Sequence, residues 1–131
     1  MKKIITVTIE RNEDSFFAWV KGLDGCVAGG NSYDEVKSNL KGILNEFIQE
    51  DETLMKKYRD GHELRFEVSL GSFFHLFPEI NISQLARLGG LNPGLLRQYA
   101  SGAKNASERQ AQKVMLALKE LADRLGAVTV R

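Results

Sequence analysis

The sequence has few residues that could build a cross-linked or metal-bound core. Its one cysteine, Cys26, excludes an internal disulfide and any zinc site made of several cysteines. With only His62 and His75 beside it, we expect no metal site and no cofactor. No apolar run approaches the roughly 18 residues that cross a bilayer, and Lys2 and Lys3 lead into an alternating segment instead of a signal-peptide core. We therefore expect a cytoplasmic protein with no membrane contact.

The composition is typical of a soluble globular protein. The chain has 131 residues, 43% hydrophobic and 27% charged, which suits one ordinary domain or two small ones. The net charge of +1 conceals an asymmetry on either side of Pro78. Residues 1–78 hold 10 Lys and Arg against 13 Asp and Glu, whereas residues 79–131 hold 8 against 4. This difference favours nucleic-acid contact by the basic second half.

Three segments of the first half have the pattern of β-strands. IITVTIE alternates apolar residues with threonine, and FFAWV follows after the turn residues NEDS, so residues 4–21 are predicted to form a hairpin. The glycine-rich segment 22–30 is predicted to be a bent or bulged continuation of the second strand. HELRFEVSL alternates again and is predicted to be the third strand.

One long helix is predicted between the second and third strands. Ser32 and Glu35 form a capping box, and an apolar stripe follows at helical spacing, made of Val36, Leu40, Ile43, Leu44, Phe47 and Ile48. A polar stretch, residues 50–61, then leads to the third strand. One helix covers only one face of such a sheet and leaves its edges open. The first half is thus expected to pair with a second copy or with a dedicated protein partner.

The carboxylates of the first half do not indicate an enzyme. A metal-dependent hydrolase needs carboxylates that project from rigid elements toward one point. The candidates lie mainly in turns and at a helix start: Asp14, Asp24, Asp34, Glu35 and Glu46. Cys26 has no evident base beside it, and the glycines lack the spacing of a phosphate loop. We therefore predict no catalytic residues.

The second half is predicted to contain a helix-turn-helix. Residues 71–78 form a short helix or linker that ends before Pro78. Asn81 and Gln84 then make a capping box for one short helix, which ends at a Gly-Gly pair. Asn92 is the predicted N-cap of the next helix, with Pro93 at its first position. Gly89 is the weak point of the pattern, since a larger apolar residue is common there and glycine costs about 1 kcal/mol relative to alanine.

The outer face of the second helix suggests contact with DNA. Burial of Leu91, Leu96 and Tyr99 turns four residues outward, namely Asn92, Gly94, Arg97 and Gln98. Arginine bonds guanine in the major groove and amide side chains bond adenine, while a glycine permits close approach. Gln84, Ser101 and Lys104 suit phosphate contacts. Each residue has an ordinary explanation as a cap or a solvated side chain, so it is their joint placement that indicates DNA binding.

A last helix begins at the capping box Ser107–Gln110 and ends near Gly126. Its predicted inward stripe is Ala111, Val114, Met115, Leu118, Leu121, Ala122 and Leu125. The tail AVTVR is β-prone and is a candidate to add to a sheet edge of a second chain.

The chain resembles the HicB family of antitoxins. The segments that carry the resemblance are FFAWVKGLDGCVAGGNSYDEVKSNLKGILNEFI, similar to the family's partial RNase-H-like domain, and INISQLARLGGLNPGLLRQYASG, similar to a lambda-repressor-type DNA-binding module. Many relatives have prolines before the Gly-Cys pair, and KGLDGC has none. The resemblance implies an α+β protein with a small three-stranded sheet and one main helix over residues 1–70, and an all-α helix-turn-helix domain over residues 79–131.

The resemblance also implies a function. The first domain is expected to bind and block a HicA-type toxin, a ribonuclease that cleaves messenger RNA, without being catalytic itself. Phe16, Phe17 and Trp19 are the candidate toxin contacts, although one face of their strand must belong to the core. The second domain is expected to repress the operon by binding operator DNA as a homodimer or tetramer. Two alternatives stay open: a stand-alone transcriptional regulator whose first half dimerises or senses a ligand, and an active nuclease.

Overall fold

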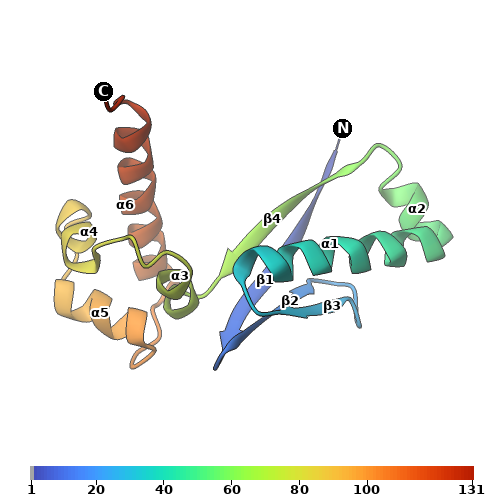
Figure 1. The fold of residues 1–131 in the computed structure, drawn as a ribbon, viewed down its shortest axis with the longest axis horizontal. Helices are drawn as coiled ribbons and strands as arrows, with labels where there is room; N and C mark the ends of the chain where they lie inside the picture. The colour runs from blue at the N-terminus through green and yellow to red at the C-terminus, as the bar shows by residue number, and fades with distance from the viewer. Residues whose placement is uncertain (1) are drawn as a thin grey trace. The chain divides into compact units, whose positions relative to one another are not determined.

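The protein has a mixed α+β architecture in two compact units (Figure 1). The structure, a computed structural model, describes residues 2–131. The first unit ends at Ser69 and holds one sheet with two helices, and the second unit, Leu70–Arg131, is entirely helical. The predicted fold class is thereby confirmed at the level of α+β.

The first unit is built on a sheet with strand order β3-β2-β1-β4. β1 pairs with β2 antiparallel and with β4 parallel, and β2 pairs with β3 antiparallel. Alternate residues of β1, namely Ile5, Val7 and Ile9, are fully or almost fully buried on one face of the sheet. The strands are β1 Lys3–Asn12, β2 Ser15–Val20, β3 Val27–Gly30 and β4 His62–Val68.

The prediction of three strands was wrong, because the glycine-rich segment contains a strand of its own. Gly22 and Gly25 have φ values of +88° and +86°, a region that glycine enters without a steric penalty. The chain reverses there, and the N–H of Val20 donates to the carbonyl of Cys26 at 3.2 Å. Residues 27–30 therefore return beside β2 as β3 instead of extending it.

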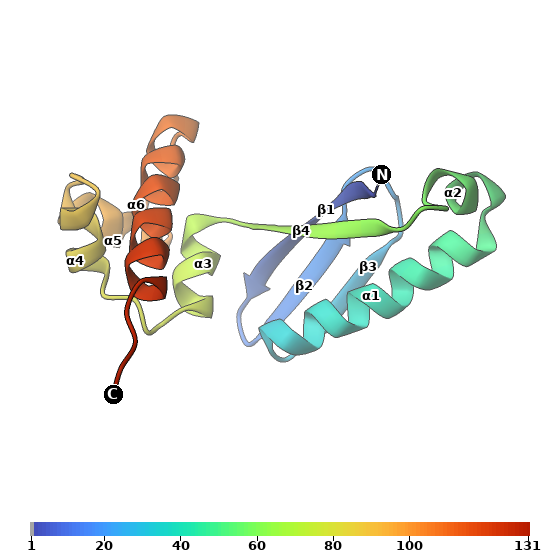
Figure 2. The same cartoon turned by 90° about the horizontal axis from the view of Figure 1, so that it is seen from above.

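Helix α1, Tyr33–Glu50, covers one face of this sheet, as Figures 1 and 2 show. The predicted cap is confirmed, since Ser32 Oγ accepts the N–H of Glu35 at 3.1 Å. The predicted stripe packs on the strands, with Val36, Leu40 and Leu44 fully buried. The start of the helix lies so close to Gly30 that a Cβ there would be 2.7 Å from the backbone nitrogen of Val36. Gly30 is thus required by this approach.

A second helix, α2, Glu52–Lys57, occupies the polar stretch for which no element was predicted. Asp51 Oδ1 accepts the N–H groups of Thr53 and Leu54 at 2.8 and 3.3 Å, so α2 has a side-chain cap. With six residues and no buried side chain, α2 has no apolar periodicity that a sequence pattern could reveal.

The second unit consists of α3 Leu70–Leu76, α4 Ile82–Leu88, α5 Pro93–Ser101 and α6 Glu108–Gly126. Its core is formed by all four helices, and Leu85, Leu96 and Val114 are almost fully buried. Helix α3 ends before Pro78, as predicted, and buries Phe74 in this core. Residues 71–76 therefore belong to the second unit's packing.

The predicted caps of the second unit are confirmed. Asn81 Oδ1 accepts the N–H of Gln84 at 3.0 Å. Ser107 Oγ accepts the N–H of Gln110 at 3.2 Å, and it starts the longest helix of this unit. The β-prone tail, residues 127–131, forms no strand.

The predicted inward stripe of α6 is only partly buried. Val114 and Ala117 are 0% and 2% exposed, whereas Met115 and Leu125 are 50% and 64% exposed. Ala122 is also exposed. The apolar arc of α6 is therefore wider than the face that the other helices of the unit cover.

Gly89 is explained by packing. A Cβ at Gly89 would lie 2.8 Å from the Cβ of Ala117 in α6. The φ of Gly89 is −91°, which any residue adopts, so space and not backbone conformation demands glycine here. The residue that looked like a weakness in the sequence lets α4 and α6 approach each other.

Candidate functional site

The predicted polar surface of α5 is present in the structure. Leu96 and Tyr99 are 1% and 8% exposed and anchor the helix in the core. Helical periodicity then turns Asn92, Arg97 and Gln98 outward, and all three are exposed. Their placement follows from the burial of the two anchors.

The start of α5 is held by its own cap. Asn92 Oδ1 accepts the N–H of Leu95 at 3.0 Å, and Pro93 takes the first turn, where its missing N–H costs nothing. A Cβ at Gly94 would lie 3.2 Å from Asn92 Oδ1 and 3.9 Å from Arg97 Nη2. Because Gly94 has no side chain, the surface between Asn92 and Arg97 stays open to a ligand that approaches the backbone.

Arg97 has a partner that the sequence did not reveal. Its Nη1 donates to Ser83 Oγ, in the first turn of α4, at 2.7 Å. Both residues are on the surface, and the bond joins the two helices across the turn between them. A hydrogen bond to one donor of a five-donor guanidinium leaves the fork geometry intact and restricts its rotation. Fourteen residues separate the pair, so only the crossing of α4 and α5 could reveal it.

The remaining predicted contacts lie at the ends of the two helices. Gln84 is exposed in the first turn of α4, directly after Ser83. Ser101 Oγ donates to the carbonyl of Gln98 at 3.1 Å and accepts the N–H of Ala103 at 3.4 Å, so its hydroxyl closes the end of α5. The backbone N–H of Lys104 donates to the same carbonyl at 3.3 Å, and its side chain is exposed. These bonds give the loop after α5 a defined path.

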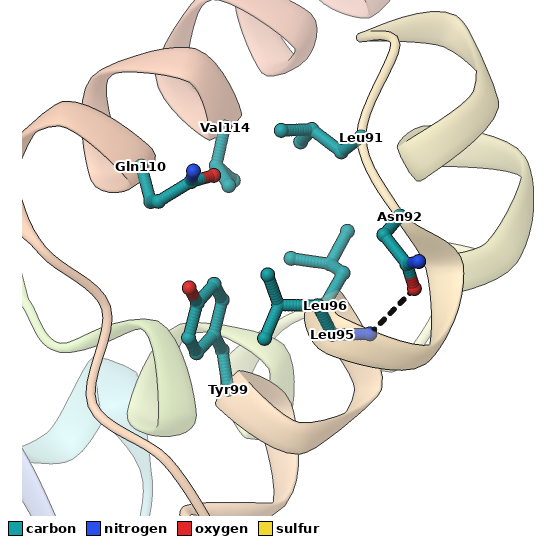
Figure 3. A pocket seen from close by; sticks show the side chains of 7 residues that line it. All are labelled: Leu91, Asn92, Leu95, Leu96, Tyr99, Gln110 and Val114. Atoms are coloured by element: carbon teal, nitrogen blue, oxygen red, sulfur yellow. Dashed lines mark hydrogen bonds between the residues drawn. The ribbon is translucent and has the colours of Figure 1, made fainter.

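A small pocket lies beside these residues, where α5 meets α6 (Figure 3). Its apolar wall includes Leu91, Leu95 and Val114, with Asn92 and Gln110 at its rim. Its volume of about 10 Å³ is close to what one water molecule needs, so it has no room for an organic ligand. The exposed outer surface of α5 is the stronger candidate for a site.

A second candidate surface lies on the first unit, on the face of the sheet opposite α1. Successive side chains of a strand point to opposite faces, and Ala18 and Val20 are buried beneath α1. Phe17 and Trp19 therefore share the opposite face of the sheet. Phe16 packs against the core beneath α1, so the structure separates it from the other two candidate toxin contacts.

Neighbouring strands extend this uncovered face. Trp19, 38% exposed, is paired in register with Val27 of β3, which is 52% exposed, and with Thr8 of β1. The sequence prediction missed Val27, because β3 was not recognised as a strand. The paired side chains of Trp19 and Val27 form an apolar patch on a surface that no helix of this unit covers.

Acidic residues accompany this apolar patch. Glu63 and Glu67 of β4 are exposed on alternate positions of the strand, with Arg65 between them. Glu10 of β1 is paired in register with Phe17 and accepts a hydrogen bond from Ser69 Oγ at 2.9 Å. Residues 1–69 contain 13 Asp and Glu against 10 Lys and Arg. The surface combines apolar area with negative charge.

The carboxylates considered for metal chemistry remain dispersed. Asp14 lies in the β1–β2 turn, Asp24 in the β2–β3 turn, and Asp34 in the first turn of α1. Within residues 2–131, no three His, Cys, Asp or Glu side chains are grouped so that they could hold a metal ion. Cys26 is fully buried, and its burial raises the pKa of the thiol, which disfavours the nucleophilic thiolate.

Comparison with known proteins shows a similarity over part of the chain. The chain is similar to a protein described as a UPF0150 protein from Helicobacter pylori strain J99, with 38% identity over 45 residues. The matched segment is 34% of this chain and 62% of that protein. No protein-family model matches the chain, and no solved structure is similar to it. None of the helices described in residues 2–131 is long and apolar enough to cross a membrane.

Proposed function

We propose that this protein is the antitoxin of a type II toxin-antitoxin pair, which neutralises a HicA-type mRNA-cleaving toxin and represses its own operon through a helix-turn-helix. The observation that carries the proposal is the surface of α5. Burial of Leu96 and Tyr99 turns Asn92 and Arg97 outward, and Ser83 of α4 holds the Arg97 guanidinium. The resemblance of the sequence to HicB antitoxins links this surface to operon repression.

The proposed DNA contact assigns different tasks to the residues of this surface. Arg97 is the base reader, because its guanidinium offers parallel donors that match guanine O6 and N7. Gln98 and Asn92 offer amide groups suited to adenine. Gln84 and Ser101 lie at helix ends and Lys104 lies in the loop after α5. All three suit contacts to phosphate, which position the module without reading sequence. The excess of 8 Lys and Arg over 4 Asp and Glu in residues 79–131 favours approach to the polyanion.

The uncovered sheet face is the proposed toxin surface. An enzyme that cleaves messenger RNA needs a cationic surface for its substrate. The patch formed by Trp19, Phe17 and Val27 offers apolar area, and Glu63 and Glu67 offer negative charge to such a partner. The proposed antitoxin acts by stoichiometric binding and has no catalytic residues or cofactor.

Substitutions on α5 test the DNA-binding part. Arg97→Ala is expected to reduce discrimination at one base pair by about 1–3 kcal/mol, because the bidentate contact is lost. Lys104→Ala is expected to weaken binding to all sequences and to lower the salt slope by about one. The measurement is fluorescence anisotropy with the upstream DNA of the gene and with a scrambled duplex, at several salt concentrations.

Arg124→Ala in the last turn of α6 is the matched control, since it removes one exposed positive charge outside α4 and α5. If Arg97→Ala and Arg124→Ala reduced the affinity and the discrimination between duplexes equally, the loss of one positive charge would explain both effects. That result would refute the base-reading role of Arg97. Footprinting is expected to show paired half-sites about 34 Å apart or at a multiple of that spacing, as a dimer requires.

Co-purification with the product of the small neighbouring reading frame tests the antitoxin part. A stable complex that restores growth supports the proposal. Trp19→Glu is expected to weaken this complex at least about 30-fold, since a buried tryptophan anchor contributes 2 kcal/mol or more. Met55→Glu, on an apolar residue of α2 that is more exposed than Trp19, should leave the complex unchanged. No complex and no toxicity, together with selective DNA binding, would favour the stand-alone regulator.

A further inference from the structure

The two edges of the sheet in the first unit are not equally protected. β3 forms one edge and β4 forms the other. β3 has four residues, two of them glycine, and the side-chain amide of Asn39 in α1 donates to the carbonyl of Gly29 at 2.8 Å. β4 has seven residues, contains neither proline nor glycine, and within residues 2–131 pairs with β1 alone. Alternate N–H and C=O groups of such an edge point away from the sheet, so β4 can accept one more strand.

The side chains of β4 define what an added strand must carry. Its apolar residues share the face that α1 occupies, but α1 packs mainly over β2 and β3, so this apolar row stays half-buried. Its charged residues are exposed on the opposite face. The apolar row is Leu64, Phe66 and Val68, and the charged row is Glu63, Arg65 and Glu67. An added strand must therefore alternate apolar residues for the first face with polar residues, including a cation, for the second.

The tail, residues 127–131, has this pattern. Val128 and Val130 are 68% and 94% exposed and are not part of the core of the helical unit. Thr129 and Arg131 alternate with them and are also exposed. Such alternation is typical of a strand with one apolar face, yet the tail forms no strand in its own unit. The tail thus lacks a sheet, and the edge of β4 lacks a strand.

We propose that the tail of a second copy adds to β4 as a fifth strand. The chain's own tail is not a strand of this sheet, so the added strand comes from another molecule. With Thr129 opposite Arg65, the period of two places Val128 and Val130 beside the half-buried apolar row of β4. The new strand then covers that row and pairs the outward backbone groups of the edge.

The charged row of β4 matches this arrangement in either strand direction. Glu63 and Glu67 lie two positions before and after Arg65, and Arg131 lies two positions after Thr129. Arg131 therefore lies opposite Glu63 if the tail runs antiparallel to β4, and opposite Glu67 if it runs parallel. An opposite-charge pair across strands is favourable in both cases.

The proposed contact is small. Five residues cover roughly 17 Å of an edge at about 3.3 Å per residue, so the association of two free copies is expected to be weak and reversible. The inference goes beyond the antitoxin function and does not rest on it, because it is argued from the edge and the tail alone. Its test contains neither DNA nor toxin, so each proposal can fail without the other.

The test is disulfide capture between two full-length variants, because a covalent bond traps a weak contact. One chain carries Arg65→Cys, and the other carries Thr129→Cys and a fusion tag that makes its mass distinct. Directly paired strand residues lie within the Cα distance that a disulfide bridges, and the buried Cys26 should not compete. Under oxidised glutathione at near-millimolar protein, the mixed dimer should form at least about tenfold faster than with the control chain Val27→Cys. Val27 is 52% exposed on the same face of the sheet, but on the opposite edge strand.

Charge reversal tests the pairing and its direction. Adding Arg131→Glu to the Thr129→Cys chain should slow capture at least about threefold, because like charges then face each other. In the Arg65→Cys chain, Glu63→Lys should restore capture if the strands are antiparallel, and Glu67→Lys should restore it if they are parallel. All of these side chains are exposed, and circular dichroism checks that each variant is folded.

Three results would overturn the proposal. The first is equal capture by Arg65→Cys and Val27→Cys, which would mean random collision. The second is restoration of capture by neither lysine variant. The third comes from a single chain that carries both Arg65→Cys and Thr129→Cys: if it links only to itself, the strand does not come from a second copy.

Discussion

Gly89→Ala is a substitution for which the sequence and the structure predict opposite results. Gly89 is the C-cap of α4, and its φ of −91° suits any residue, so alanine there should be favoured over glycine by up to about 1 kcal/mol through the smaller entropy of the unfolded chain. In the structure the added Cβ would lie 2.8 Å from the Cβ of Ala117, well inside the 3.5–4.0 Å of a favourable carbon-carbon contact. The neighbouring atom is the start of a side chain on α6, so the helices must separate to relieve the overlap.

The magnitude follows from these two terms. Overpacking a well-packed contact costs typically about 1–3 kcal/mol. Subtracting the entropic gain of up to about 1 kcal/mol leaves a net destabilisation of roughly 1 kcal/mol. For a helical unit of the size of residues 70–131, this corresponds to a fall in Tm of about 4–8 °C.

A double-mutant cycle identifies the cause of the destabilisation. Ala117→Gly removes the opposing Cβ, so Gly89→Ala should become neutral or stabilising in that background. The coupling between the two sites should be about 1–3 kcal/mol, measured by thermal or urea unfolding followed by circular dichroism. A higher Tm for Gly89→Ala alone, or an effect that is the same in both backgrounds, would refute the close approach of α4 and α6.

Further predictions concern the first unit and the α4–α5 bond. Gly30→Ala should destabilise the protein by about 1–3 kcal/mol in urea unfolding, because the added Cβ would lie 2.7 Å from the backbone nitrogen of Val36. Gly42→Ala, in the middle of α1 with open space around it, should stabilise the protein by about 1 kcal/mol. Destabilisation by both substitutions would contradict this account. Burial raises the pKa of the Cys26 thiol, so the unfolded chain loses the thiol proton at lower pH than the folded chain. The free energy of unfolding should therefore fall as the pH rises above about 8.5. This fall should be less steep in Cys26→Ala. Ser83→Ala should lower base discrimination without changing the salt slope, because only the orientation of the Arg97 guanidinium is affected; a changed slope would mean that Ser83 contacts phosphate.

Local signals in the sequence were sufficient for the helix starts. Ser32, Asn81, Asn92 and Ser107 each cap a helix by accepting the backbone N–H of the residue three positions later, so neighbouring residues carry the whole signal. The strands with period-two alternation could also be predicted from neighbouring residues, because alternation alone decides which side chains of β1 are buried. The exposed surface of α5 follows from the spacing of its two anchors, Leu96 and Tyr99.

Other features needed contacts between distant parts of the chain. Strand β3 was missed because its four residues include two glycines, and only its pairing with β2 makes it a strand. The bond between Arg97 and Ser83 depends on how two helices cross. No local pattern specifies that crossing.

The sequence by itself determined the α+β class, the four helix caps and the residues that α5 turns outward, because each depends on neighbours within one or two helical turns or on alternation along one strand. The tertiary structure decided which side chains of α6 stay exposed, why Gly89 and Gly30 are glycine, and what holds Arg97. These depend on the distance between elements far apart in the chain, and that distance is set by the packing of whole surfaces.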